Sequence, residues 1–239
     1  EAVEQVAQAR ELLDRWPRSS WLQYARLDDH LGNIWRADAL ADMGFDGISE
    51  PTDDFQATES RQAAALGVMH VEPGSEQHRS AMAKLERAAE LKIPAALAVD
   101  SVRYSMLDAD SRWRWAAHVS GRMLAGAFSV AWEWENTELL SELIEYHSAR
   151  GTFAHEPLDE ASTWDGGVGT TVVADTAAEE ALAAGGASVD GLTLTTLGPL
   201  PPLQMDPSRA PILERYRRLA HSRYGQTVTS DGPAWSTWP

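Results

Sequence analysis

The chain has 239 residues, enough to bury a hydrophobic core as one large domain or as two small ones. Its 36 Asp and Glu residues against 20 Lys and Arg give a formal net charge of -16, which disfavours binding to the phosphates of nucleic acids and to anionic membranes. It has no cysteine, which excludes disulfides, cysteine-based zinc sites and a cysteine nucleophile.

The first residues and the composition bear on location. Residues 1–5 lack the basic and apolar regions of a signal peptide, and no apolar run reaches the roughly eighteen residues of a membrane span. A chain without cysteine suits a reducing compartment, so we expect a soluble, cytoplasmic protein whose partners are proteins or small molecules. The chain begins with Glu1 and not with Met, which leaves open a start further upstream.

Residues 1–107 form an N-terminal region that is either helical or α/β. Apolar residues at helical spacing predict a helix over residues 1–16, ended by Pro17. Ser75 predicts the N-cap of another helix, which runs to Leu91. Both helices are compatible with either fold.

The α/β alternative depends on three short apolar runs. Each follows an expected helix, and the run over residues 93–99 predicts a buried strand. Helical hairpins with apolar turns would give the same apolar runs, and Pro94 is unusual inside a strand. The expected helices before the first two runs are residues 37–43 and 60–66, and the strands would be residues 45–48, 68–72 and 94–100.

Residues 108–151 give the clearest pattern, an antiparallel helical hairpin that we expect to form the core. Asp108 or Asp110 caps its first helix, and Asn136 or Thr137 caps the second. The fold is therefore expected to be mainly α, a helix pair or bundle with an irregular linker and a C-terminal helix.

In one stretch of this hairpin, residues 128–135, side chains alternate with the two-residue period of a strand. Residues 128–135 would then place Glu133 and Glu135 on one face, as a paired acid and base. The alanine-rich sequence before them favours the helix.

The last third of the chain divides into a linker and a basic end. Residues 152–208 are rich in Gly, Pro and Ala and predict an irregular linker. Residues 209–239 follow as a helix opened by Pro211 and a tryptophan tail. This helix is rich in arginine, so we expect it to dock on the acidic body of its own chain or of another copy.

The strongest enzyme hypothesis requires the α/β alternative. His70 and Glu72 would share one face of a strand, and Asp100 would end the next strand. The three side chains would then meet at the carboxyl edge of a parallel sheet, where α/β enzymes place their chemistry.

Other polar clusters predict solvated charge, and we expect no metal and no cofactor. Residues adjacent on a helix point about 100° apart and do not chelate as a set. Metal sites of helical bundles use a Glu followed by a His three residues later, a spacing that these clusters lack. The clusters are Asp28-Asp29-His30, and Glu142 with Glu145 and His147.

The ten tryptophans include three close pairs, at residues 113 and 115, 132 and 134, and 235 and 238. A two-residue step turns a helix by about 200°, so one member of a helical pair faces a surface other than the core. Tryptophan and arginine are favoured anchors of protein interfaces. The predicted interaction residues are Trp132, Trp134, Arg215, Arg218, Trp235 and Trp238.

Four runs of the sequence together contain tryptophan pairs, residues typical of packed helices and a Leu-Gly-Pro-Leu-Pro-Pro-Leu segment. These runs are residues 113–116, 127–134, 142–151 and 197–225. They resemble uncharacterised actinobacterial proteins that are encoded with, or fused to, CHAT-type caspase-like peptidase domains. The resemblance implies a role in a peptidase-linked defence or signalling system. It carries over no catalytic residue, because the caspase-like nucleophile is a cysteine.

We therefore expect a non-enzymatic helical interaction or regulatory protein, a companion or non-catalytic segment of such a peptidase system. Its partner would be the peptidase or another copy of the chain. Two alternatives remain open. One is a small α/β enzyme that uses His70, Glu72 and Asp100, and the other is a peptidase substrate cleaved within residues 152–196.

Overall fold

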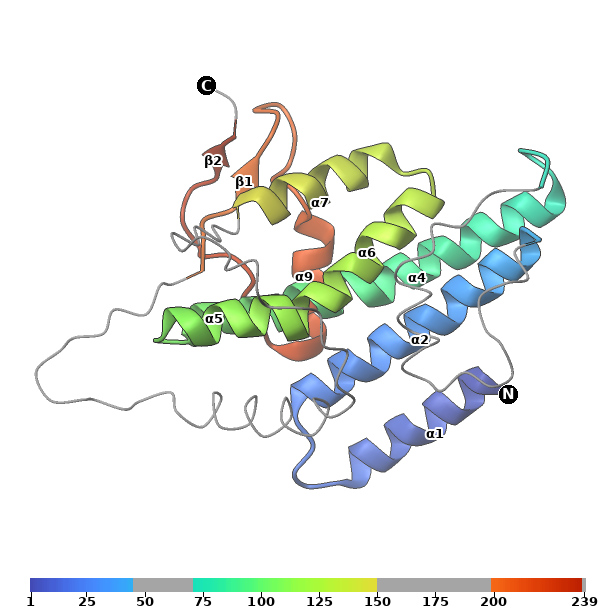
Figure 1. Cartoon of the computed structure of the whole chain (residues 1–239), viewed down its shortest axis with the longest axis horizontal. Helices are drawn as coiled ribbons and strands as arrows, with labels where there is room; N and C mark the ends of the chain where they lie inside the picture. The colour runs from blue at the N-terminus through green and yellow to red at the C-terminus, as the bar shows by residue number, and fades with distance from the viewer. Residues whose placement is uncertain (45–70, 150–198, 238–239) are drawn as a thin grey trace, which may run out of the picture.

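A computed structural model describes residues 1–44, 71–149 and 199–237 of the protein, and these residues are mainly helical (Figure 1). The predicted mainly α fold is confirmed. In the described parts of the chain, no helix combines the length and the apolar character that crossing a membrane requires. In chain order the elements are α1 (Ala2–Arg15), α2 (Trp21–Asp42), α4 (Glu76–Ser101), η1 (Val102–Ser105), α5 (Ala109–Trp115), η2 (Ala116–Ser120), α6 (Gly121–Glu133), α7 (Thr137–Ala149), β1 (Leu203–Gln204), α9 (Glu214–Tyr224) and β2 (Trp235–Ser236).

Helix α4 is the centre of the fold, with α2, α6 and α9 packed against it. Figure 1 shows α2 and α4 side by side over most of their length. Residues 91–101, the second half of α4, are all buried. Of these, Ile93 and residues 95–99 form one hydrophobic core with Leu124 and Val130 of α6 and with Tyr216 of α9.

The strand expected over residues 93–99, and with it the strand at 94–100 of the α/β alternative, is wrong, because these residues continue α4 to Ser101. Partner helices enclose residues 93–99 of α4, so this stretch is apolar on all sides and lacks the one-sided spacing of a surface helix. A short, continuously apolar run has no periodicity to distinguish a buried helix from a buried strand.

Pro94 is accommodated inside α4 because another helix supplies a missing hydrogen bond. A proline has no N–H to donate to the carbonyl four residues earlier, which here belongs to Glu90. The Arg223 guanidinium of α9 donates to that carbonyl oxygen at 2.6 Å. Thus α9 docks on the turn of α4 that the proline leaves without its backbone donor.

Several predicted helix ends are confirmed. Helix α1 ends at Arg15, just before Pro17, and the Ser75 hydroxyl caps α4 by accepting a hydrogen bond from the His78 N–H at 3.1 Å. Asp108 caps α5 through the Ser111 N–H at 2.7 Å.

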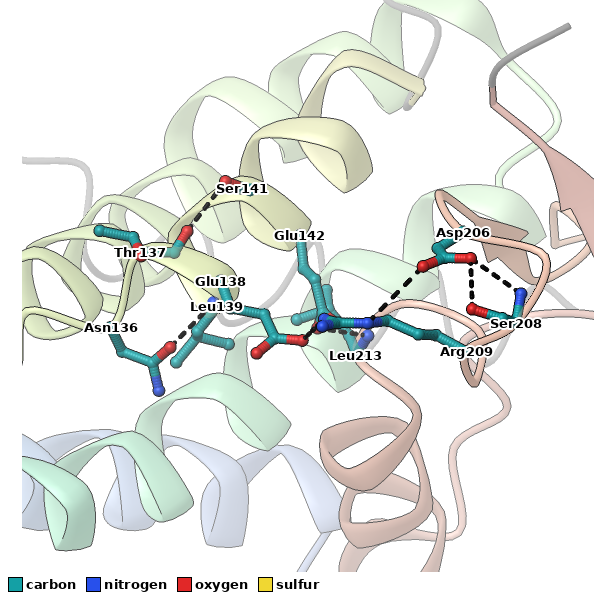
Figure 2. Close-up of polar contacts among 10 residues, drawn as sticks. All are labelled: Asn136, Thr137, Glu138, Leu139, Ser141, Glu142, Asp206, Ser208, Arg209 and Leu213. Atoms are coloured by element: carbon teal, nitrogen blue, oxygen red, sulfur yellow. Dashed lines mark hydrogen bonds and ion pairs between the residues drawn. The ribbon is translucent and has the colours of Figure 1, made fainter.

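The hairpin predicted around residues 108–151 begins and turns as expected. The helix preferred for residues 128–135 is confirmed as far as Glu133, where α6 ends. Of the two proposed caps of α7, Asn136 accepts a hydrogen bond from the Leu139 N–H at 3.0 Å (Figure 2). The helix expected over residues 37–43 is the last part of the longer α2.

The C-terminal segment, residues 199–237, returns to the bundle and packs on α4 and α7. Figure 2 shows Arg209 paired with Glu138 of α7, and the Leu213 N–H donating to the Glu142 carboxylate at 2.9 Å. Leu213 has a left-handed backbone, with φ 53°, and α9 begins directly after it. Strands β1 and β2 pair in parallel, with Leu203 opposite Trp235.

Some expectations fall on residues outside the described ranges. These are the apolar run 45–48, the helix at 60–66, residues 68–70 of the second run, and residues 152–198 of the linker with its proposed cleavage region 152–196.

Candidate interaction site

The residues of the enzyme alternative do not come together as a site in the described structure. His70 lies outside the described residues, and Glu72 is exposed in the turn before α4. Asp100 lies in a helix and is fully buried, and its carboxylate accepts hydrogen bonds from Ser120 at 2.7 Å and Tyr146 at 2.8 Å. These contacts give Asp100 a structural role, in which it joins α4 to η2 and α7.

The solvated cluster expected at Asp28-Asp29-His30 is wrong for the two carboxylates, which are buried. Asp28 accepts a hydrogen bond from the Tyr224 hydroxyl at 2.7 Å and lies 3.1 Å from the Arg10 guanidinium. Burial and the neighbouring Asp28 charge raise the pKa of Tyr224 well above its ordinary value. The partners of Asp28 come from α1 and α9, so the sequence around it gives no sign of the pairing.

Asp29 is paired with a lysine that crosses the middle of the bundle. The Lys92 ammonium donates to Asp29 and to Asn33 at 2.6 Å each. Its stem passes between Gly32 of α2 and Gly126 of α6. A Cβ atom added at these glycines would lie 2.3 Å from Lys92 Cγ and 2.7 Å from Lys92 Cε, respectively. Glycine inside both helices therefore makes room for the buried lysine.

A second buried ion pair fixes the end of α6. The Arg36 guanidinium of α2 binds both carboxylate oxygens of Glu133, with Nε–Oε2 and Nη2–Oε1 distances of 2.7 and 2.5 Å. Bidentate arginine–carboxylate pairs of this kind fix the relative orientation of both side chains. Glu133 is thus held by α2, whereas Glu135, its proposed acid–base partner, lies in the next turn.

The turn from α6 to α7 has Glu135, and not glycine, in its left-handed position. The Asn136 N–H bonds the Ala131 carbonyl at 3.1 Å and the Glu135 N–H bonds the Trp132 carbonyl at 3.0 Å, the two hydrogen bonds of a Schellman motif. That motif places a left-handed residue after the helix, usually glycine, and here it is Glu135 with φ 55°. A left-handed conformation costs a residue with a side chain about 1 kcal/mol.

A pocket of about 280 Å³ opens beside this turn. Met43 of α2, Ala131 of α6 and Leu140 of α7 give it an apolar lining. Trp132 also lines it and is 54% exposed, while Glu135 is exposed at the same place. The full lining is Met43, Ala131, Trp132, Glu133, Glu135, Asn136, Thr137 and Leu140.

The tryptophan pairs on helices divide as predicted. Trp134, one of the predicted interaction residues, packs against the core, while Trp132 faces outward. In the other pair, Trp115 is buried and its indole N–H donates to the Val99 carbonyl at 2.8 Å, whereas Trp113 is 45% exposed. In both pairs the helical turn between the two residues separates a core side chain from a surface one.

The remaining predicted interaction residues lie on the C-terminal segment. Arg215 pairs with Glu90 of α4, and Arg218 pairs with a carboxylate four residues earlier in α9 at 3.6 Å. Trp235 is 56% exposed on β2, and Trp238 lies outside the described residues. The two arginines thus make contacts within the chain, and Trp235 presents its ring at the surface.

The sequence predicts one part of the pocket, the outward tryptophan, and does not predict the left-handed turn beside it. The spacing of Trp132 and Trp134 indicated an outward tryptophan, but no sequence pattern marks Glu135 as left-handed, because the glycine that usually reveals such a turn is missing. Over the described ranges, no group of three or more His, Asp or Glu side chains is arranged to hold a metal ion. No protein-family model, curated protein or solved structure matches this chain.

Proposed function

We propose that this protein is a non-enzymatic interaction module that binds a partner protein at the pocket between α6 and α7. The observation that carries the proposal is Trp132, a large aromatic side chain that is 54% exposed beside a mainly apolar pocket. Tryptophan is typical of binding hot spots, because its burial removes a large apolar area from water at a small cost in side-chain entropy.

The surroundings of Trp132 favour binding because they are already fixed. The Arg36–Glu133 pair holds the end of α6, and the Asn136 cap holds the start of α7. A pocket whose walls are ordered before binding loses little conformational entropy when a partner arrives.

The partner class in this proposal is a caspase-like peptidase of a bacterial defence or signalling system, with both proteins in the cytoplasm. The support is the resemblance to actinobacterial proteins associated with CHAT-type peptidases. One of the resembling runs, residues 127–134, supplies Ala131, Trp132 and Glu133 of the pocket. The pocket and the resemblance therefore share these three residues.

The test is calorimetric titration of the full chain with the caspase-like peptidase encoded beside it in its host. We expect Trp132→Ala to weaken binding by about 30-fold, since truncating a hot-spot tryptophan costs about 2 kcal/mol. The matched control is Trp113→Ala, which removes an exposed tryptophan from α5, away from the pocket lining.

The two parts of the proposal fail separately. If the unaltered chain does not bind the peptidase, the partner class is wrong. If Trp132→Ala and Trp113→Ala bind with the affinity of the unaltered chain, the pocket has no part in the interaction. Circular dichroism of each variant checks that the helices are intact.

A further inference from the structure

The pocket beside Trp132 has features that specify more than apolar contact. Its volume, about 280 Å³, lies just below the range of about 300–1,000 Å³ typical of small-molecule pockets, and it suits a single inserted side chain. An apolar lining favours a side chain with a hydrocarbon body. The polar groups at the pocket then determine which functional group the end of that inserted side chain carries.

The charges at the pocket are not balanced. Glu133 is neutralised by Arg36, as described above. Glu135 is exposed and makes no ion pair among the described residues, so its carboxylate leaves a negative charge at the pocket. A complementary ligand therefore carries a positive charge.

The backbone of Glu135 gives an independent reason to assign its side chain a role. Glycine would occupy the left-handed position of this Schellman motif without strain, and glutamate does so at a cost of about 1 kcal/mol. Strained residues of this kind concentrate at binding and catalytic sites. No hydrogen bond or ion pair of the Glu135 carboxylate within the described structure offsets the cost.

Trp132 is the second group that recognises a cation. The face of an indole ring attracts an ammonium or guanidinium group held within about 6 Å of it. Lysine and arginine place such a group at the end of an apolar stem, which can lie along apolar surface. The lining of Met43, Ala131 and Leu140 matches the stem, and Trp132 with Glu135 matches the charged end.

The geometry points to a pocket that receives the side chain of one arginine or lysine of the partner protein. This inference rests on the proposed function and adds the chemistry of the contact. The carboxylate of Glu135 pairs with the cation, the ring of Trp132 covers it, and the apolar lining takes the stem.

The probe for the test is the peptide acetyl-Leu-Arg-Leu-amide, titrated into the full ¹⁵N-labelled chain. Its matched control carries citrulline, a neutral side chain of nearly the same shape, in place of arginine. We expect the arginine peptide to shift the Trp132 indole N–H and the backbone N–H of Glu135, and to bind at least about tenfold more tightly than the citrulline peptide. Equal affinities would overturn the inference.

Glu135→Gly separates binding from folding. The glycine fits the left-handed position, so the variant should unfold at the same or a higher temperature than the unaltered chain. It should bind the arginine peptide at least about tenfold more weakly, because the carboxylate is gone. Unchanged affinity in a variant that folds normally would exclude Glu135 from the contact. Glu135→Gln, which keeps the size of the side chain, should bind as weakly as Glu135→Gly.

The peptidase titration distinguishes failure of this inference from failure of the proposed function. If Trp132→Ala weakens peptidase binding and Glu135→Gly does not, the function stands and the cationic contact is wrong. If the arginine peptide binds at the pocket and the peptidase does not, the cation site stands and the partner class is wrong.

Discussion

Lys92 leaves no room for a larger residue at two neighbouring positions, Gly32 and Gly126. A Cβ atom at position 32 would lie 2.3 Å from Lys92 Cγ and 3.3 Å from the Ala88 carbonyl oxygen. We predict that Gly32→Ala lowers the free energy of unfolding by about 2 kcal/mol, because overpacking of about 3 kcal/mol outweighs the gain of about 1 kcal/mol in helix propensity. Urea unfolding followed by circular dichroism measures the difference.

The control for Gly32→Ala is Gly232→Ala on the C-terminal segment. There the nearest atom to an added Cβ is the Ser230 hydroxyl oxygen at 3.4 Å, close to ordinary van der Waals contact. The expected change in unfolding free energy is within about 0.5 kcal/mol. If Gly32→Ala were as stable as this control, Lys92 would have another route through the bundle.

Glu142 couples the α7–α9 contact to pH. Burial raises its carboxyl pKa above the ordinary 4.5, although the carboxylate accepts the Leu213 N–H. As pH falls through the raised pKa, the folded chain takes up a proton before the unfolded chain does, so this group makes the protein more stable down to about pH 4.5. We predict that Glu142→Gln is more stable than the unaltered chain at neutral pH and that the difference shrinks as pH falls to 4.5.

The comparison needs unfolding free energies of both proteins across this pH range. Glutamine keeps an oxygen that can accept the Leu213 N–H and removes the half-buried charge. Glu142→Ala removes the acceptor as well, so it should be less stable than Glu142→Gln at each pH. A Glu142→Gln difference that does not change with pH would contradict the assignment.

At the scale of elements, the helices that the sequence predicted well are those with one exposed side. Helix α1, the start of α4 and the hairpin of α6 and α7 display apolar residues on one face, and capping residues mark several of their ends. Such helices show their period because solvent selects polar residues for the outer face.

Helix α2 and the second half of α4 were harder to predict for opposite reasons. The inner face of α2 carries Asp28, Asp29 and Arg36, whose partners lie far along the chain, so its buried side looks polar. Residues 93–99 of α4 are apolar on all sides and include Pro94, so they resemble a strand. In both cases the deciding partner is a tertiary contact that no local pattern records.

Pro94 of α4 and Arg223 of α9 are coupled, because Arg223 donates to the Glu90 carbonyl that Pro94 leaves without a backbone donor. Arg223→Ala should lower the free energy of unfolding by about 1 kcal/mol, because the Glu90 carbonyl loses its donor. In a Pro94→Ala background the helix gains the missing backbone N–H, so we predict that Arg223→Ala then costs much less. A double-mutant cycle measures this coupling, and strictly additive effects would show that the two residues act independently.

At the scale of the whole molecule, the C-terminal segment belongs to the core. Ile212, Tyr216 and Tyr224 are buried in the same cluster as α4 and α6, and burial raises the pKa of Tyr216 to about 12. The ion pairs of Arg209 and Arg215 lie at the surface. The charge pattern correctly indicated docking, but apolar burial gives the larger energy, because exposed ion pairs contribute only about 0–1 kcal/mol.

This difference in magnitude predicts how the segment responds to substitution and to salt. Tyr216→Ala should lower the free energy of unfolding by about 3–5 kcal/mol, since it removes a buried aromatic ring. Arg215→Gln should lower it by at most about 1 kcal/mol, and by less in concentrated salt, where exposed charges are screened. Urea unfolding at low and high sodium chloride tests both. If Arg215→Gln proved the more damaging, or if salt alone released the segment, charge would hold it in place, and α9 would be a detachable arm instead of part of the core.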